Sequence, residues 1–182
     1  MRIFISGGCK NGKSTYAQRL AKQQSGGSLY YIATMAAVDH EDAQRIADHQ
    51  KEREVWGFTT IEQPRRIEDV LAKCNPGGSF LMDSLTALLA NEMFGGNGDF
   101  DDNACDRVAA GLSKILAQIP RIVIVSDYIY SEAALYDPLT EAYRRSLATL
   151  DRLAARHCDV VLEAAYTQII VHRGGEVFHA IS

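Results

Sequence analysis

A short glycine-rich segment near the N-terminus carries the clearest chemistry of this sequence. It reads Gly7-Gly8-Cys9-Lys10-Asn11-Gly12-Lys13-Ser14 and follows the apolar residues 3–5, so it fits the pattern G-x-x-x-x-G-K-S. In this pattern backbone N–H groups surround phosphate oxygens, the lysine adds positive charge at the β- and γ-phosphates, and the serine hydroxyl can ligate Mg²⁺. The segment therefore predicts a P-loop that binds a nucleoside triphosphate. The alternative is a glycine turn without a ligand.

An acidic residue provides the second candidate group. Asp83 ends the apolar run Ser79-Phe80-Leu81-Met82. A P-loop protein uses a carboxylate at the end of a buried strand to hold the Mg²⁺ that its serine also ligates. We therefore expect a Mg²⁺ site at Ser14 and Asp83. The alternative is a helix N-cap formed by Asp83 and Ser84, and both roles can coexist.

A third candidate group is a histidine between two arginines. Arg45, His49 and Arg53 recur at i, i+4 and i+8, which places them on one face of a helix. The flanking positive charges would keep His49 neutral and nucleophilic, and the arginines would stabilise charge that develops on phosphate oxygens. The alternative is an ordinary solvated helix, because other charged residues are interleaved with these three. They are Glu41, Asp42, Asp48, Lys51, Glu52 and Glu54.

Strands and helices that alternate along the chain would position these groups. After a first strand before the P-loop, we expect strands at 29–33, 58–62, 79–83, 121–126, 159–164, 169–172 and 177–179. We expect helices at 14–24, 40–54, 66–74, 84–94, 103–118 and 138–156. This alternation predicts an α/β fold of the P-loop NTPase (RecA-like) type, with a mostly parallel sheet that binds ligands at the carboxyl ends of its strands. The last two strands should form an antiparallel hairpin at Gly174-Gly175.

Composition and charge limit the class of protein. With 182 residues, 47% of them hydrophobic, residues 1–182 can form a single domain. The net charge of −4 provides no basic field for nucleic acid or an anionic membrane, and no apolar run approaches the roughly 18 to 20 residues of a membrane span. The four cysteines are widely spaced and there is no N-terminal signal segment, so we expect free thiols in a cytoplasmic protein.

The first 95 or so residues resemble one known family, the bifunctional adenosylcobinamide kinase/adenosylcobinamide-phosphate guanylyltransferase of cobalamin biosynthesis. The similarity begins with the P-loop and the segment Tyr31-Ile32-Ala33-Thr34. It continues with Arg45-Ile46-x-x-His49-x-x-x-Arg53, Phe58-Thr59-Thr60-Ile61-Glu62 and Asp83-Ser84-Leu85-Thr86, and Asn91 also fits. In this family the histidine of R-I-x-x-H-x-x-x-R becomes covalently guanylylated. The resemblance therefore implies that His49 is the nucleophile.

The resemblance also implies substrates, partners and binding residues. A kinase step would phosphorylate adenosylcobinamide from ATP or GTP, with Lys13 and Mg²⁺ neutralising the transferring group. In a guanylyltransferase step, His49 would take GMP from GTP and pass it to adenosylcobinamide phosphate, giving adenosylcobinamide-GDP. The family implies a homo-oligomer, a trimer. Nucleotide contacts beyond the P-loop would come from Ala33, Thr34, Arg45, Gln50, Lys51, Glu52, Arg53, Glu62 and Asp83.

The C-terminal half departs from the family pattern. Where the family has Asn-Glu-Val-Gly-x-Gly, this chain reads Asp127-Tyr128-Ile129-Tyr130-Ser131-Glu132 and lacks both glycines. The family pattern Phe-Arg-Asp-x-x-Gly-x-x-Asn-Gln corresponds to residues 143–152, which keep only the aromatic–arginine pair Tyr143-Arg144. Two alternatives therefore stay open: a P-loop small-molecule kinase without guanylyl transfer, or a nucleotide-binding homologue that has lost part of its catalysis. A regulatory GTPase is disfavoured because no N-K-x-D element is present.

Overall fold

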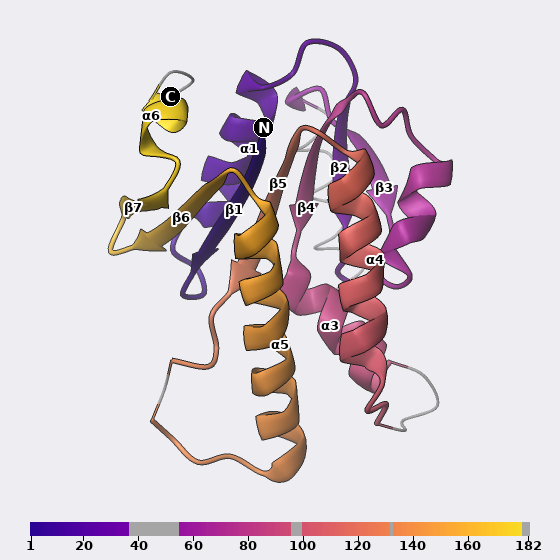
Figure 1. Cartoon of the computed structure of the whole chain (residues 1–182), viewed down its shortest axis with the longest axis vertical. Helices are drawn as coiled ribbons and strands as arrows, with labels where there is room; N and C mark the ends of the chain where they lie inside the picture. Colours follow the sequence, from indigo (N-terminus) through magenta and orange to yellow (C-terminus); the bar gives the residue numbers. More distant parts are fainter. Residues whose placement is uncertain (37–54, 96–99, 132, 180–182) are drawn as a thin grey trace.

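A seven-stranded sheet forms the centre of the molecule (Figure 1). The structure is a computed structural model that describes residues 1–36, 55–95, 100–131 and 133–179. The strands are β1 (Arg2–Gly7), β2 (Leu29–Ala33), β3 (Thr59–Glu62), β4 (Ser79–Asp83), β5 (Ile122–Asp127), β6 (Val160–Ala165) and β7 (Gln168–Arg173). Their order in the sheet is β3-β2-β4-β5-β1-β6-β7, and every neighbouring pair is parallel except β6 and β7. The predicted fold class is confirmed.

Helices cover both faces of this sheet (Figure 1). They are α1 (Lys13–Gln23), the 3₁₀ helix η1 (Ile67–Ala72), α3 (Leu85–Phe94), α4 (Ala104–Gln118), α5 (Pro138–His157) and α6 (Gly175–His179). Helices α3, α4 and α5 pack against one another on one face, and α1 packs on the opposite face. Parallel strands need such crossover connections. The P-loop and the other loops that follow the parallel strands therefore lie at one edge of the sheet, where these strands have their carboxyl ends.

The alternation of side chains along the strands explains why both faces are covered. In β4, Phe80 and Met82 join the core cluster beneath α3, α4 and α5, whereas Leu81 between them joins the cluster beneath α1. All three side chains are fully buried. Successive strand residues point to opposite faces, so an uninterrupted apolar run of this kind requires a sheet buried on both sides.

Polar caps fix where two helices begin at the carboxyl edge of the sheet. The Ser84 hydroxyl accepts a hydrogen bond of 3.1 Å from the Ala87 N–H and starts α3. The Asp137 carboxylate accepts from Leu139 N and Thr140 N and starts α5, with Pro138 at the first helical position. The N-cap role that the sequence left open between Asp83 and Ser84 falls to Ser84.

Two sequence expectations at the level of elements were wrong. Residues 177–179 lie in helix α6, and the antiparallel hairpin is formed by β6 and β7, which turn at Tyr166 and Thr167. Both turn residues have positive φ although neither is glycine. The sequence therefore carries no glycine signal at the true turn, and the glycines at 174 and 175 suggested a wrong position for the hairpin. The helix expected at 66–74 is present as a 3₁₀ helix at 67–72. The expected helix at 40–54 lies outside the described residues.

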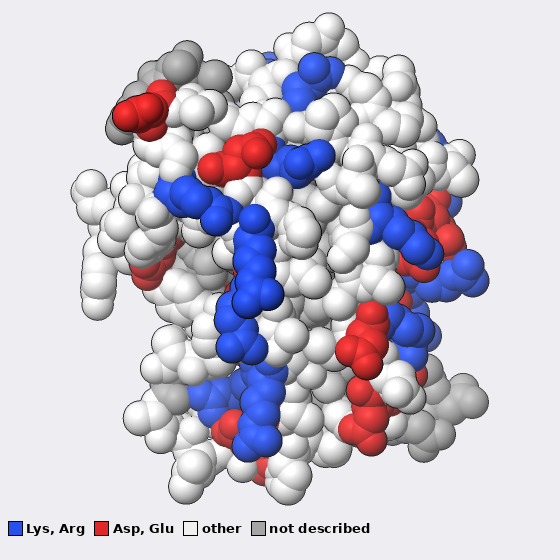
Figure 2. Space-filling view, viewed as in Figure 1, with Lys and Arg blue, Asp and Glu red and all other residues white. Residues whose placement is uncertain are grey.

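The surface charge follows the amphipathic pattern of α5. Figure 2 shows a line of basic side chains along this helix, and Arg145, Arg152 and Arg156 are exposed on it. Leu147 and Leu150 on the other side of the helix are fully buried. The basic residue Arg156 in the last turn also complements the negative end of the helix dipole. Across the described residues, no helix has the length and apolar character needed to span a membrane.

Removal of a buried leucine tests the two-sided packing of the sheet. We expect Leu81→Ala to lower the free energy of unfolding by about 2–5 kcal/mol, because it leaves a cavity between β4 and α1. The matched control is Leu135→Ala, whose side chain is 96% exposed and should cost less than about 0.5 kcal/mol. Equilibrium unfolding in urea measures both values, and equal effects of the two substitutions would contradict the described packing.

Candidate functional site

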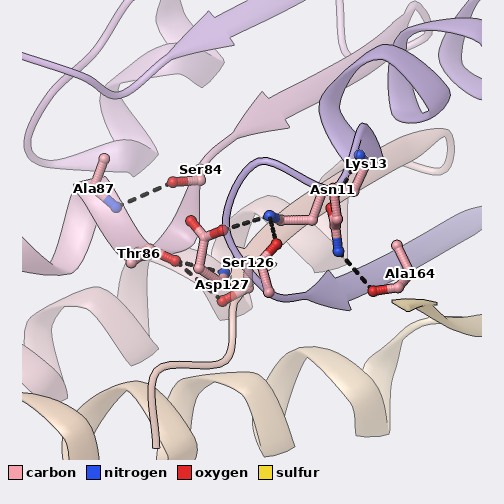
Figure 3. A network of polar contacts seen from close by, with 9 residues as sticks. Asn11, Lys13, Ser84, Thr86, Ala87, Ser126, Asp127 and Ala164 are labelled. Atoms are coloured by element: carbon pink, nitrogen blue, oxygen red, sulfur yellow. Dashed lines mark hydrogen bonds and ion pairs between the residues drawn. The ribbon is translucent and has the colours of Figure 1, made fainter. Parts of the chain in front are cut away.

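The P-loop joins β1 to α1 at the carboxyl edge of the sheet, in the strand–loop–helix context that the sequence predicts. A Cβ atom at Gly7 would lie 2.5 Å from the Ala164 carbonyl oxygen, so only glycine fits there. Gly12, with a φ of 83°, is the N-cap of α1 and adopts the left-handed conformation that glycine favours. The Asn11 side chain donates to Ala164 O at 2.6 Å and accepts from Lys13 N at 3.2 Å (Figure 3). The first bond holds the loop against β6, and the second lies within the loop.

Lys13 is the central side chain of the loop. It is only 5% exposed, and its Nζ donates to Gly8 O at 2.9 Å and forms an ion pair with the Asp127 carboxylate (Figure 3). A buried ammonium group is costly unless it is paired and hydrogen-bonded. Asp127 therefore supplies the compensating charge in this structure.

Asp127 lies at the end of β5, where its Cα is paired in register with Gly7 of β1. Its backbone N–H donates to the Thr86 hydroxyl at 2.8 Å, which ties β5 to the first turn of α3. The sequence singled out Asp127 only as a departure from the family pattern and did not place it in the site. The signal that could have found it is the one that found Asp83, an acidic residue that ends a buried apolar strand.

Asp83 lies at the end of β4, two strands from the P-loop strand. Its carboxylate accepts a 2.8 Å hydrogen bond from the Tyr31 hydroxyl. Burial raises the pKa of Asp83, although hydrogen bonds from Tyr31 and Ser14 and the charge of Lys13 favour the ionised form. The Ser14 hydroxyl therefore lies beside the Asp83 carboxylate, and a Mg²⁺ site shared by these two groups stays a prediction. The sequence analysis placed Tyr31 in the family-like segment 31–34 but gave it no role in the site.

This pair of oxygen donors suits one kind of metal ion. Within the part of the chain that the structure describes, no group of three or more His, Cys, Asp and Glu side chains could hold a metal. Mg²⁺ does not need such a group, because it binds one or two carboxylates together with waters and substrate phosphates. A hydroxyl from Ser14 and a carboxylate from Asp83 fit that preference.

Other residues that the sequence assigned to the nucleotide have varied surroundings. Thr34 is fully buried, and its hydroxyl donates to Ser84 O at 2.7 Å and accepts from Ser84 N at 2.6 Å. Its backbone carbonyl accepts from the Asn91 amide at 2.6 Å, so Thr34 links β2 to the start of α3. Ala33 is buried, and Glu62 is exposed opposite it at the end of β3.

The remaining predicted residues divide into two groups. Cys9 and Lys10 are exposed on the P-loop, where the backbone rather than the side chains would surround a phosphate. Arg45, His49, Gln50, Lys51, Glu52 and Arg53 lie outside the described residues. The structure thus describes the P-loop side of the predicted site and brings Lys13, Ser14, Asp83 and Asp127 together.

Helix α5 anchors the chain that follows β5. Arg144 is buried, and its guanidinium donates to Ile129 O and Ala134 O, each at 3.2 Å. The Tyr143 hydroxyl donates to Thr86 O at 2.9 Å. The aromatic–arginine pair that the chain shares with the family therefore fixes the loop after β5 and the start of α3.

A buried carboxyl group lies on the same helix. Asp151 is 3% exposed, and its Oδ2 accepts from the Tyr130 hydroxyl at 2.8 Å. Burial raises the pKa of Asp151 to about 6, although hydrogen bonding by Ser126 and Tyr130 favours the ionised form. The nearby Asp127 carboxylate raises this pKa further.

Comparison with known proteins places the sequence among cobalamin-pathway enzymes. Residues 3–167 match the profile of the family described as cobinamide kinase / cobinamide phosphate guanyltransferase. The chain is 32% identical over 163 residues to the bifunctional adenosylcobalamin biosynthesis protein CobP of Pseudomonas aeruginosa, covering 88% of this chain and 91% of that protein. It is 33% identical over 108 residues to the CobU protein of the same description from Escherichia coli, covering 58% of each.

Solved structures show similarity of fold alone. The flagellar accessory protein FlaH of Methanocaldococcus jannaschii has a TM-score of 0.50 and 15% identity, covering 94% of this chain and 77% of that one. The KaiC-like protein PH0186 of Pyrococcus horikoshii has a TM-score of 0.51 and 10% identity, covering 94% and 78%.

The buried carboxyl group on α5 predicts a pH-dependent stability. Below about pH 4, Asp151 is protonated in both the folded and the unfolded chain. Between about pH 4 and 6 the unfolded chain loses this proton while the folded chain keeps it, so stability falls as pH rises. Above that range the cost is constant, at about 3 kcal/mol or less.

Substitution of this residue by its neutral isostere measures the effect. We expect Asp151→Asn to raise the free energy of unfolding at pH 7.5 by about 1–3 kcal/mol and to leave it unchanged at pH 4. Urea unfolding at the two pH values provides the measurement, with the exposed Asp102→Asn as control. The same gain in stability at both pH values would show that burial of the charge is not its cause.

Proposed function

The chain belongs to the cobinamide kinase / cobinamide phosphate guanyltransferase family, and we propose that it is a bifunctional enzyme of cobalamin biosynthesis. It phosphorylates adenosylcobinamide and then transfers GMP from GTP to adenosylcobinamide phosphate, which gives adenosylcobinamide-GDP. The observation that carries the proposal is the buried Lys13 of the P-loop beside Ser14 and Asp83. This arrangement supports a site that binds a triphosphate and positions it for transfer.

In the kinase reaction, the P-loop would hold the β- and γ-phosphates of ATP or GTP through its backbone N–H groups and Lys13. Ser14 and Asp83 would hold Mg²⁺, which neutralises charge on the phosphates when it is bound. The hydroxyl of the aminopropanol arm of adenosylcobinamide would attack the γ-phosphorus. The protein contributes mainly position and electrostatic stabilisation to this step.

In the guanylyl transfer, His49 would attack the α-phosphorus of GTP and expel pyrophosphate. The product is a guanylyl-histidine phosphoramidate, from which the phosphate of the second substrate takes GMP. Arg45 and Arg53, four residues before and after His49 in the sequence, would hold the phosphates in line. The sequence spacing supports these roles, together with nucleotide contacts by Ala33, Thr34, Gln50, Lys51, Glu52 and Glu62.

The proposal includes the setting in which the enzyme works. We place it in the cytoplasm as one catalytic domain that assembles into a homo-oligomer, a trimer, without nucleic acid. Two alternatives give different results in the experiment below: a kinase in which His49 only binds phosphate, and a homologue that binds nucleotides but catalyses neither step.

Labelling by radioactive GTP tests the covalent step. With α-³²P-labelled GTP and Mg²⁺, we expect the wild-type chain to acquire an acid-labile, base-stable label, as a phosphoramidate requires. His49→Ala should reduce this label at least 100-fold, because the attacking nitrogen is lost. The control is His157→Ala, which removes an exposed histidine at the end of α5 and should leave the label unchanged.

Phosphorylation of adenosylcobinamide, followed with γ-³²P-labelled ATP or GTP, separates the alternatives. His49→Ala should keep this activity, because the kinase step does not use the histidine nitrogen. A wild-type chain that phosphorylates but never becomes labelled would identify the enzyme as a kinase alone. A chain that binds GTP yet carries out neither reaction would refute the proposed function.

A further inference from the structure

A buried tyrosine binds the carboxylate that we assign to Mg²⁺. The Tyr31 hydroxyl donates a 2.8 Å hydrogen bond to Oδ2 of Asp83. Tyr31 lies in β2 and is only 7% exposed, and Asp83 ends the neighbouring strand β4. The bond therefore joins a buried side chain of one strand to the proposed metal ligand of the next.

The register of β2 and β4 explains why the hydroxyl reaches the carboxylate. Tyr31 is paired with Leu81, and Asp83 lies two residues further along β4. Residues two apart on a strand point to the same face, and Tyr31 and Leu81 both belong to the core cluster beneath α1. A diagonal neighbour of this kind is within reach of an aromatic side chain. Since Ser14 lies in the first turn of α1, it meets Tyr31 and Asp83 on this same face.

Packing holds the ring of Tyr31 and therefore the position of its hydroxyl. The ring meets Phe58 edge to face, with centroids 5.8 Å apart and an interplanar angle of 89°. Phe58 is itself buried in the cluster beneath α1. A side chain whose rotamer is locked by packing can hold a functional group in place. Tyr31 has the surroundings that such a role requires.

The adjacent tyrosine of β2 has a different environment. The ring of Tyr30 stacks on Phe80, with centroids 4.8 Å apart, and lies against the core cluster on the other face of the sheet. Its hydroxyl accepts a 3.3 Å hydrogen bond from Asn75 N, in the turn that precedes β4. The two phenols are thus bonded near opposite ends of β4. Tyr30 therefore provides a matched control for the hydroxyl of Tyr31.

We propose that Tyr31 is a positioning residue for Mg²⁺, because its hydroxyl holds the Asp83 carboxylate in the orientation in which it binds the ion. The inference rests on the proposed Mg²⁺ site and so on the proposed function. An ionised carboxylate has about four acceptor sites, so the bond to Tyr31 leaves capacity for the Ser14 hydroxyl and for a metal ion. Loss of a partner that orients a metal ligand typically weakens metal binding or activity by about 10–100-fold.

A purely structural role is the competing explanation. A buried phenol usually has a hydrogen-bond partner, and Asp83 could serve that purpose alone. Loss of the hydroxyl would then lower the free energy of unfolding but leave metal affinity unchanged. Positioning instead predicts a loss of metal affinity that depends on the Asp83 carboxylate.

Tyr31→Phe tests the inference, because it removes the hydroxyl and keeps the ring. The probe is Mn²⁺, which favours the same oxygen ligands as Mg²⁺ and is detected by electron paramagnetic resonance. With a non-hydrolysable GTP analogue and excess protein, we expect the Kd for Mn²⁺ to rise about 10-fold or more. The Kd for the analogue without metal, measured by calorimetry, should not change. Tyr30→Phe should change neither value.

Asp83→Asn and the double variant show whether Tyr31 acts through Asp83. Asp83→Asn should itself weaken Mn²⁺ binding, and Tyr31→Phe should have no further effect in that background. Unchanged Mn²⁺ binding in Tyr31→Phe, with weaker binding in Asp83→Asn, would overturn the inference and leave the proposed Mg²⁺ site intact. An equal effect of Tyr31→Phe in both backgrounds would also overturn it. Unchanged Mn²⁺ binding in Asp83→Asn would refute the Mg²⁺ site itself.

Discussion

The ion pair between Lys13 and Asp127 is the interaction on which the rest of this structure depends. A buried ammonium group needs a compensating charge, and Asp127 can supply it only because β5 lies beside β1 in parallel register. The same register places Asp83 on the next strand, so three charged groups from distant parts of the sequence meet at one edge. The pair also sets a condition for the proposed function. A phosphate would have to replace the Asp127 carboxylate as the partner of the Lys13 ammonium group.

Hydrogen bonds between polar groups hold the scaffold around this pair together. Thr34 and Asn91 connect the end of β2 to α3 through hydrogen bonds to backbone groups. Thr86 connects α3 to β5, and Tyr143 of α5 binds the carbonyl of the same residue. Apolar side chains fill both faces of the sheet at β4 and β5, so the polar residues of these two strands lie at their ends. These hydrogen bonds therefore hold the strand ends that carry the functional groups.

The sequence predicted the parts of this arrangement that depend on local pattern. The P-loop, the parallel α/β sheet and the position of Asp83 at a strand end could all be read from spacing and apolar runs. The hairpin turn at Tyr166 and Thr167 could not, because it adopts positive φ without glycine. The contact between Asp127 and Lys13 joins residues 114 positions apart, so only the sheet order reveals it. Thr34 was assigned to the nucleotide, yet the structure gives its hydroxyl two partners in the backbone of Ser84.

In both proposed reactions Lys13 would exchange Asp127 for a phosphate, since each reaction begins with a triphosphate in the P-loop. A crystal structure of the chain with Mg²⁺ and a non-hydrolysable GTP analogue tests it most directly. The account predicts that Lys13 Nζ lies within hydrogen-bonding distance of β- or γ-phosphate oxygens and no longer contacts Asp127. A bound nucleotide whose phosphates lie elsewhere, with the pair between Lys13 and Asp127 intact, would contradict it.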